Sequence, residues 1–252
     1  MNQERRDKIA EMLERQHTIK NTELMERFGI SIETVRRDLA YLEEQGFLER
    51  VYGGAVRKRF MNAEPGYTNR EKENSSEKLM IAHEAEKLIH QNDTVFFDLG
   101  TTVLSLARNI DSGKDITAFT NSLRTAIVLS EKGCDVIIPG GQLRAGEFAV
   151  SGSLAESGMQ QFNIDKAIIG VAGITESGIT DFVLKEASLR RQVIKNARKV
   201  IALADFSKFG VRAMCNVCPL ADIDVLITDE KAPSDMLKEF EKKGIKIIVA
   251  NL

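Results

Sequence analysis

The chain has 252 residues, of which 43% are hydrophobic and 29% are charged. This is the composition of an ordinary globular protein, and no apolar run reaches the roughly 18 residues that a membrane-spanning helix needs. The formal net charge of −2 excludes a protein that holds nucleic acid by bulk positive charge, so any such contact has to be local.

The N-terminal stretch MNQERRDKIAEMLERQ is charged throughout and lacks the apolar centre of a signal peptide, so we expect a cytoplasmic protein. Residues 3–15 carry apolar side chains at helical spacing and predict a first helix. Asn21 is expected to cap a short second helix, which ends at Gly29.

The next segment predicts a third helix followed by a hairpin. Ser31 is its expected cap, and Val35, Leu39 and Leu42 form one buried stripe. The stretches FLERV and AVRK, separated by the turn YGG, are typical of two short strands. Three helices and a hairpin predict a winged helix-turn-helix domain over residues 1–59.

Arg36 and Arg37 lie off the buried stripe of the third helix. An arginine pair on a helix is often only a solvated face, here with ion pairs to Asp38 and Glu33. A recognition helix, however, turns its N-terminal side chains toward the major groove of double-stranded operator DNA, and a basic wing meets phosphates. We therefore favour DNA binding and expect these contact residues: Ser31, Glu33, Thr34, Arg36, Arg37, Arg57, Lys58 and Arg59.

Residues 60–76, FMNAEPGYTNREKENSS, are polar, contain Pro65 and Gly66 and have no apolar period, which predicts a linker. Residues 77–252 alternate apolar runs with helical patterns. The predicted strands are TVFFDLG, ITAFTN, CDVIIPGG, KAIIGVAG, KVIALAD, DVLITD and IKIIVAN, with helices near 102–110, 122–132, 153–161, 184–197 and 234–243. This order predicts an open α/β domain with a parallel sheet covered on both faces.

Ligands of such sheets bind beyond the carboxyl ends of the strands. The DLGTT stretch at 98–102 opens a helix there and offers backbone N–H groups and two hydroxyls to a phosphate. Lys208 is a natural counter-charge, and Asp98 and Asn121 can bind sugar hydroxyls. One glycine-rich turn is often only a tight connection. Five strand ends, however, carry polar residues or glycines and together predict a small anionic ligand: DLGTT, TNS at 120–122, GG at 140–141, GVAG at 170–173 and DFSK at 205–208.

Cys134, Cys215 and Cys218 are too few and too irregularly spaced for a disulfide framework. The CNVC stretch has the spacing of a metal or redox pair, but no second Cys or His pair lies near it. We therefore favour packing thiols, and the sequence predicts no metal and no cofactor.

The stretches TVRRDLAYLEEQGFLERVYGGA, FDLGTT, TNS, PGG, ADFSKFG and ITD, in this order, resemble the DeoR family of bacterial repressors of sugar catabolism. The resemblance covers essentially the whole chain. It implies a winged-helix domain joined to a sensor domain similar in fold to ribose-phosphate isomerases, assembled as dimers or tetramers and responding to phosphorylated sugars. It would place the effector site on Asp98, Gly100, Thr101, Thr102, Thr120, Asn121, Gly141 and Lys208.

Four positions depart from the family pattern. Tyr52 replaces the histidine of a common HGGA, Leu99 replaces the serine of DSGTT, Phe206 replaces a small polar residue, and Arg190 stands where lysine is frequent. The Leu99 and Phe206 changes make the predicted pocket rim more apolar and leave the effector's identity open.

The leading hypothesis is a repressor of sugar or polyol catabolism genes that a phosphorylated intermediate releases from its operator, and that is not an enzyme. The alternative is a sugar-phosphate isomerase-like enzyme that carries a DNA-binding domain, with Asp98, Asp181, Glu186 and Lys208 as candidates for the base and the cation. The sequence leaves open whether the protein represses or activates, and which sugar or polyol phosphate it senses.

Overall fold

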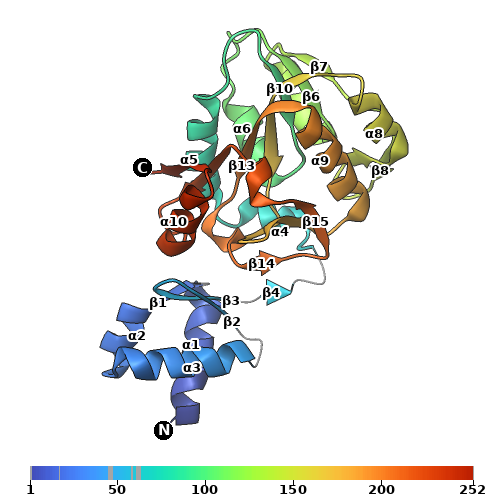
Figure 1. Ribbon diagram of the computed structural model, residues 1–252. Coiled ribbons are helices and arrows are strands. Elements are labelled where there is room, and N and C mark those ends of the chain that lie inside the picture. The colour runs from blue at the N-terminus through green and yellow to red at the C-terminus, as the bar shows by residue number, and fades with distance from the viewer. Residues whose placement is uncertain (1, 17, 45–47, 58, 61–63, 252) are drawn as a thin grey trace.

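The computed structural model describes residues 2–16, 18–44, 48–57, 59–60 and 64–251. Figure 1 shows a small N-terminal domain lying against one end of a larger domain that is built around a long sheet. The short sheet of the N-terminal domain faces the larger domain, and its helices lie on the far side.

The N-terminal domain is a winged helix-turn-helix, as predicted. Its elements are α1 (Asn2–Gln16), β1 (Thr18–Lys20), α2 (Asn21–Phe28), α3 (Ile32–Glu44), β2 (Leu48–Val51) and β3 (Gly54–Arg57). Val35, Leu39 and Leu42 of α3 are buried in one core with side chains of α1 and α2, which confirms the predicted stripe. The β2–β3 hairpin is confirmed as well, with Val51 opposite Gly54.

Strand β1 was not predicted, and it corrects the expected cap of α2. Lys20 is still extended and pairs with Gly54, so that α2 begins at Asn21 itself. The Asn21 backbone N–H donates to the carbonyl of Gly53 at 2.7 Å. No side-chain cap bond is formed, because the hairpin already supplies the acceptor at this end of the helix.

Asp38 holds α1 against α3. It is 2% exposed, and its carboxylate accepts from Arg5 Nε at 2.6 Å and from Arg6 Nε at 2.9 Å. It therefore faces inward and is not a surface partner of the neighbouring arginine pair. Arg36 does pair with Glu33 at 3.1 Å, but both side chains are largely exposed.

The larger domain begins after a short connecting segment. Its elements are α5 (Ser75–Glu86), β5 (Thr94–Phe97), α6 (Thr101–Asn109), β6 (Thr117–Thr120), α7 (Leu123–Glu131), β7 (Asp135–Ile137), β8 (Gln142–Arg144), β9 (Ala149–Ser151), α8 (Ser153–Met159), β10 (Ile164–Gly170), β11 (Gly173–Thr175), β12 (Gly178–Asp181), α9 (Leu184–Asn196), β13 (Ala197–Leu203), η1 (Phe206–Lys208), β14 (Val211–Arg212), β15 (Cys215–Cys218), η2 (Leu220–Asp222), β16 (Val225–Asp229), α10 (Ser234–Lys242) and β17 (Lys246–Ala250). The seven predicted strands form one sheet in the order β17-β16-β13-β10-β5-β6-β7.

All neighbouring strands of this sheet are parallel, which confirms the predicted open α/β architecture. Alternate strand residues enter different cores. Phe97 packs with side chains of α5 and α6, whereas Phe96 packs in the core that includes α8, α9 and α10. Helices therefore cover both faces of the sheet, as Figure 1 shows.

The segment expected to be a linker contains structure of its own. β4 (Arg59–Phe60) pairs in parallel with β14, and α4 (Tyr67–Lys72) follows before α5 begins at Ser75. Helix α5 was not predicted either. Its buried face carries Ala82 and Ala85 beside Ile81, and such small side chains give a weak apolar period.

We predict that Asp38→Asn destabilises the N-terminal domain by about 1 to 3 kcal/mol, because it leaves two partly buried guanidinium groups without their carboxylate. Denaturant unfolding of the full chain measures the effect. Glu33→Gln is the control, since loss of an exposed ion pair costs about 0 to 1 kcal/mol. Equal stability of the two variants would contradict the assigned role of Asp38.

Candidate functional site

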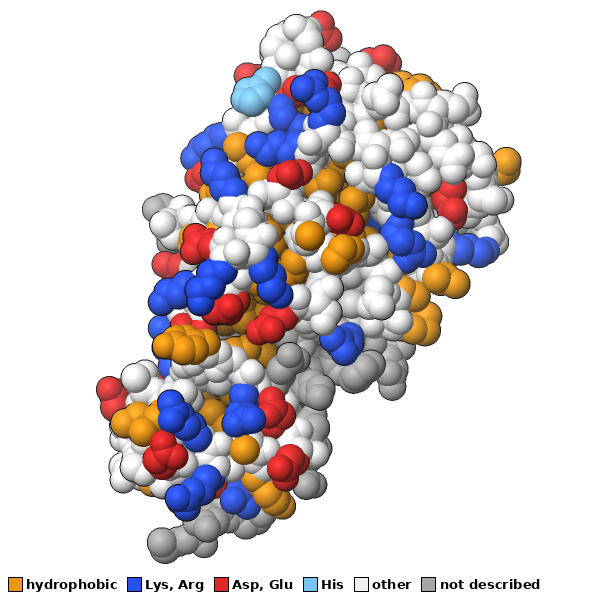
Figure 2. Space-filling model, in the orientation of Figure 1, with side chains coloured by type: hydrophobic (Ala, Val, Ile, Leu, Met, Phe, Trp, Pro, Cys, Tyr) orange, Lys and Arg blue, Asp and Glu red, His pale blue; other side chains and the backbone are white. Residues whose placement is uncertain are grey.

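Helix α3 lies on the side of the N-terminal domain that is away from the larger domain (Figure 1), and its exposed side chains are polar. Ser31 caps it, because the Thr34 backbone N–H donates to Ser31 Oγ at 3.4 Å, and the two hydroxyls lie 3.1 Å apart. Glu33, Arg36 and Arg37 are exposed on the same helix. Figure 2 shows basic and acidic side chains side by side on the visible face of this domain. This face therefore carries no large patch of positive charge, and DNA contacts there would depend on individual basic side chains.

The three basic wing residues are described only in part. Arg57 lies in β3 and Arg59 in β4, where the structure gives the backbone alone, and Lys58 lies outside the described residues. The tip of the wing meets the larger domain. Gly53 has a positive φ of 86°, and a Cβ there would clash with the carboxylate of Asp235 at the start of α10. In this arrangement the wing tip packs against the larger domain.

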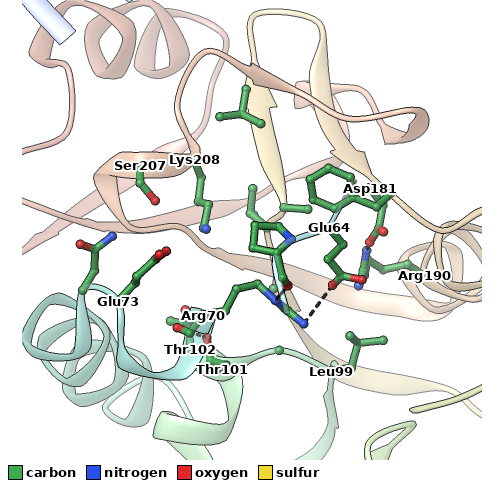
Figure 3. A pocket seen from close by; sticks show the side chains of 18 residues that line it. Glu64, Arg70, Glu73, Leu99, Thr101, Thr102, Asp181, Arg190, Ser207 and Lys208 are labelled. Carbon is green, nitrogen blue, oxygen red and sulfur yellow. Dashed lines mark hydrogen bonds and ion pairs between the residues drawn. The ribbon is translucent and has the colours of Figure 1, made fainter. Parts of the chain in front are cut away.

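The larger domain holds a cavity of about 260 Å³ at the carboxyl ends of its strands (Figure 3). Four of the predicted effector residues line it: Gly100, Thr101, Thr102 and Lys208. Residues 170–172 and Ser207 complete this side of the wall. The first N–H groups of α6 have no acceptor within the helix, so this wall can donate hydrogen bonds to an anion.

The order of the strands explains which predicted residues meet. From β5 the chain moves outward through β6 and β7, then returns to β10 on the other side of β5 and continues to β13. The cavity lies beyond β5, β10 and β13, which are neighbours at this reversal. Open α/β sheets bind their ligands at such switch points.

Thr120, Asn121 and Gly141 do not line the cavity that four of the other predicted residues share. Thr120 is the last residue of β6, Asn121 follows it, and Gly141 follows β7, so all three lie outside the reversal. The β8–β9 hairpin covers the end of β6, since the Val150 N–H donates to the Asn121 carbonyl at 2.7 Å. At Gly141, with φ of 141°, a Cβ would lie 2.7 Å from the Ser151 carbonyl oxygen, so this glycine serves the packing of the hairpin.

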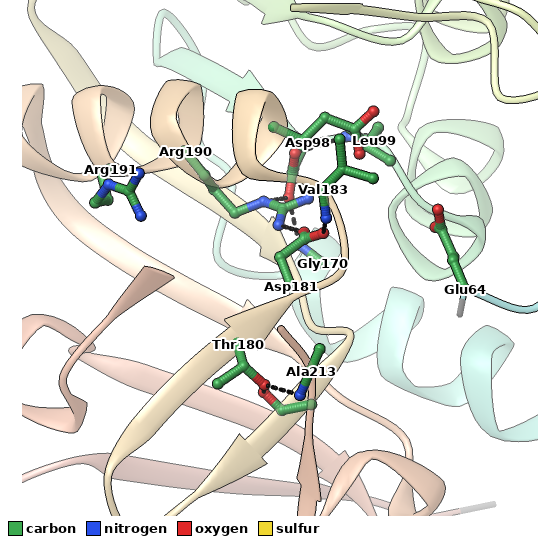
Figure 4. A network of polar contacts seen from close by, with 12 residues as sticks. Glu64, Asp98, Leu99, Gly170, Thr180, Asp181, Val183, Arg190, Arg191 and Ala213 are labelled. Carbon is green, nitrogen blue, oxygen red and sulfur yellow. Dashed lines mark hydrogen bonds and ion pairs between the residues drawn. The ribbon is translucent and has the colours of Figure 1, made fainter. Parts of the chain in front are cut away.

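Asp98 supports the floor of the cavity and does not face its interior (Figure 4). It is 1% exposed, lies 2.5 Å from Arg190 Nε, and accepts from the backbone N–H groups of Leu99 at 2.8 Å and Gly170 at 3.1 Å. Arg190 also contacts Asp181. Burial raises the pKa of Asp98, and the Arg190 guanidinium opposes the rise. The predicted contact of Asp98 with a sugar hydroxyl is therefore replaced by a structural ion pair.

The opposite wall comes from the segment that precedes α5, which the sequence predicted as a linker. Glu64, Pro65, Arg70, Glu73 and Asn74 all line the cavity. Arg70 Nη2 lies 3.0 Å from Glu64 and 2.5 Å from Glu147. Sequence reasoning missed these residues because the segment has no apolar period. The one sequence signal that could have found them is the run of charged residues at 70–73, which can form ion pairs with the neighbouring domain.

Polar and aromatic contacts hold this segment on the larger domain. The guanidinium of Arg124 lies 4.2 Å from the ring centre of Tyr67. The buried Lys78 ammonium donates to the carbonyls of Arg70 and Glu73, and Thr101 Oγ1 donates to the same Arg70 carbonyl at 3.3 Å. Burial lowers the pKa of Lys78. One wall of the cavity is thus bonded directly to the other.

The same stretch of chain connects the cavity to the N-terminal domain. β3 of the wing ends at Arg57, and β4 at residues 59–60 pairs with β14. Val211 of β14 lines the cavity. A change at the cavity therefore has a short covalent path to the domain that carries α3.

The candidate catalytic carboxylates are engaged in ion pairs. Asp98 and Asp181 share Arg190, and Glu186 lies 2.6 Å from Arg144 Nε. Burial raises the pKa of Glu186 to about 7, with Arg144 opposing and Glu64 adding to the rise. This pKa suits a general base, but Glu186 does not line the cavity, whereas Lys208 does.

The remaining sequence features have structural positions. Leu99 lines the cavity as expected, whereas Phe206 does not. Cys215 and Cys218 lie in β15 and pack in the core. Among the described residues there is no group of three or more potential metal ligands. None of the helices in the described part of the chain could cross a membrane.

Solved structures resemble part of the chain. A ribose 5-phosphate isomerase A from Methanocaldococcus jannaschii is 16% identical, with a TM-score of 0.42 over 54% of this chain and 55% of that one. A translation initiation factor eIF-2B from Pyrococcus horikoshii is 17% identical, with a TM-score of 0.46 over 60% and 62%. Likenesses this distant say nothing about activity.

Curated relatives match along nearly the whole length. The HTH-type transcriptional regulator GolR of Listeria innocua is 34% identical over 98% of both chains. The HTH-type transcriptional repressor GlcR of Bacillus subtilis is 35% identical over 98% of this chain and 96% of its own. The glycerol-3-phosphate regulon repressor of Escherichia coli is 31% identical over 97% of both.

Two family descriptions match in the order that the fold shows. Residues 5–59 match the DeoR-like helix-turn-helix domain, and residues 73–230 match the DeoR C terminal sensor domain. Together with relatives above 30% identity over nearly the full length, these matches establish that the chain belongs to the DeoR family of helix-turn-helix transcription regulators.

Proposed function

We propose that the protein represses genes of sugar or polyol catabolism and that a phosphorylated sugar or polyol releases it from its operator. One observation carries the proposal. A cavity that is lined on one side by the start of α6 and Lys208 is closed on its other side by residues 64–74, the stretch of chain that leads back to the winged helix-turn-helix. The larger domain would thereby act as the sensor and α3 as the reader of DNA.

The cavity favours an anion over a neutral sugar. Thr101 and Thr102 open α6, whose positive dipole end and free N–H groups attract negative charge. Lys208 lines the same cavity from η1. A phosphate can satisfy these donors together, whereas an unphosphorylated sugar leaves buried donors poorly paired.

The exposed face of α3 supports DNA binding by local contacts. Arg37 has no acidic side chain within ion-pair distance among the residues that the structure describes, so its guanidinium is available to a base or phosphate. Within the described part of the chain, Arg36 pairs with the exposed Glu33 alone, and such a pair is weak enough to exchange for DNA. Residues of the wing base, 57–59, would add phosphate contacts.

We predict that Arg37→Ala weakens operator binding by about 1 to 3 kcal/mol if Arg37 reads a base, and otherwise lowers the salt dependence of binding. Fluorescence anisotropy at several salt concentrations distinguishes the two outcomes. Arg198→Ala removes an 82% exposed arginine from the larger domain and is the matched control. If Arg37→Ala and Arg36→Ala both bind like the control, α3 does not read the operator.

We also propose a homodimer or homotetramer that binds repeated half-sites, because one winged helix contacts few base pairs. Leu143, Leu154 and Leu184 are 48%, 71% and 61% exposed, on β8, α8 and α9. These elements lie close together, since α8 contacts α9 and Lys185 donates to Gln142. Light scattering at micromolar concentration should show at least a dimer, and a monomer with and without DNA would contradict this.

We predict that Lys208→Ala abolishes the effector response and leaves operator affinity unchanged, because Lys208 lines the cavity and lies far along the chain from α3. A panel of phosphosugars is titrated against a preformed operator complex. It includes glycerol 3-phosphate, which the name of one relative suggests, with glycerol as its neutral counterpart.

The control for this titration is Lys195→Ala, an exposed lysine on α9 outside the cavity wall. It should respond to effector like the wild-type protein. Release of DNA from Lys208→Ala at the wild-type effector concentration would show that the effector binds elsewhere. Equal release by glycerol and glycerol 3-phosphate would show that the phosphate is not what the cavity recognises.

A further inference from the structure

Within the cavity, a carboxylate of the chain itself forms an ion pair with an arginine. Glu64 lines the cavity, and its side chain is only 16% exposed. One of its oxygens lies 3.0 Å from Arg70 Nη2, and the other lies 2.8 Å from Arg144 Nη1. Figure 3 shows the Arg70 guanidinium reaching into the middle of the site, with its dashed contact to Glu64.

The charges around these two arginines do not balance. Arg70 also pairs with Glu147, and Arg144 also pairs with Glu186, so three carboxylates meet two guanidinium groups. If Glu64 left, each arginine would keep one carboxylate partner. Glu64 is therefore the carboxylate that can leave this cluster without depriving either arginine of a partner, and its departure removes a like-charge repulsion that contributes to the raised pKa of Glu186.

An incoming phosphate would compete for the same position. Arg70 and Lys208 line one cavity with Thr101 and Thr102. A dianion held by the N–H groups at the start of α6 and by Lys208 would attract Arg70 and repel the Glu64 carboxylate. Arginine suits this exchange, because its planar fork binds a phosphate as readily as a carboxylate.

We propose that Glu64 is an internal stand-in for the effector, which holds Arg70 in the effector-free protein and is replaced there by the effector's phosphate. This proposal rests on the proposed function. It names Glu64 as the residue through which effector binding would move the connecting segment. Glu64 lies close in sequence to β4, which pairs with β14. Its expulsion from the cavity would move the strand next to the wing, which links effector binding to the position of α3.

Inorganic phosphate, titrated into the full-length protein by calorimetry, is the probe. Glu64→Gln keeps the shape of the side chain and removes its charge, so phosphate should bind about tenfold more tightly than to the wild-type protein, within the usual range of coupling between sites. Glu71→Gln is the matched control. Glu71 belongs to the same segment but pairs with Arg108 outside the cavity, and it should leave phosphate affinity unchanged.

A double-mutant cycle tests whether Arg70 is the shared partner. Arg70→Gln should lose most of the phosphate affinity, and adding Glu64→Gln in that background should restore none of it. A gain of the same size with and without Arg70 would mean that Glu64 acts through general charge, which overturns the proposal. Thermal unfolding of each variant confirms that it is folded before it is titrated.

Two failures can be told apart. If Glu64→Gln binds phosphate no more tightly than Glu71→Gln, while phosphosugars still release DNA from the wild-type protein in a Lys208-dependent way, the stand-in proposal is wrong and the proposed function stands. If neither phosphate nor any phosphosugar binds to the wild-type protein or to Glu64→Gln, both are wrong.

Discussion

The Arg70 ion pairs hold the connecting segment, residues 64–74, on the larger domain. Arg70 belongs to the short helix α4 and reaches across to Glu147 on the β8–β9 connection and to Glu64 at the start of its own segment. Its backbone carbonyl is bonded in turn by Lys78 and Thr101. The segment 64–74 is polar and has no apolar face that could hold it on the domain. These contacts therefore keep it in place, and without them the cavity would have no second wall.

The floor of the cavity is held more firmly than the wall formed by residues 64–74. On the floor, Arg190 is 3% exposed and bridges two buried carboxylates, Asp98 and Asp181. A lysine, with its compact charge, could not span both in the same way, so arginine at this position suits a fixed floor. The wall of residues 64–74 instead depends on the ion pairs of Arg70, whose side chains are 9–16% exposed. The guanidinium of such a pair suits a phosphate as well as a carboxylate, so this wall is the one that a ligand could rearrange.

The sequence predicted the parts of the fold that follow from local periodicity. The buried stripe of α3, the hairpin and all seven parallel strands are confirmed. It could not predict the order of the strands, and that order decides which strand ends meet. Thr101 and Lys208 meet because β5, β10 and β13 are neighbours, whereas Asn121 lies beyond β5 under a hairpin. The sequence suggested Asp98 as a ligand because it follows a strand. Its buried partner Arg190 is distant in sequence, so their ion pair could not be predicted.

The proposed release of DNA requires one coupling, between the cavity wall formed by Gly100, Thr101, Thr102 and Lys208 and the segment 64–74. Hydrogen exchange of the full chain, with and without a phosphorylated ligand that releases DNA, measures it most directly. If the two are coupled, exchange should change in peptides covering residues 64–74 and 206–212 as well as 99–104. A change confined to residues 99–104 would mean that the ligand binds without moving the segment, and would rule out the coupling.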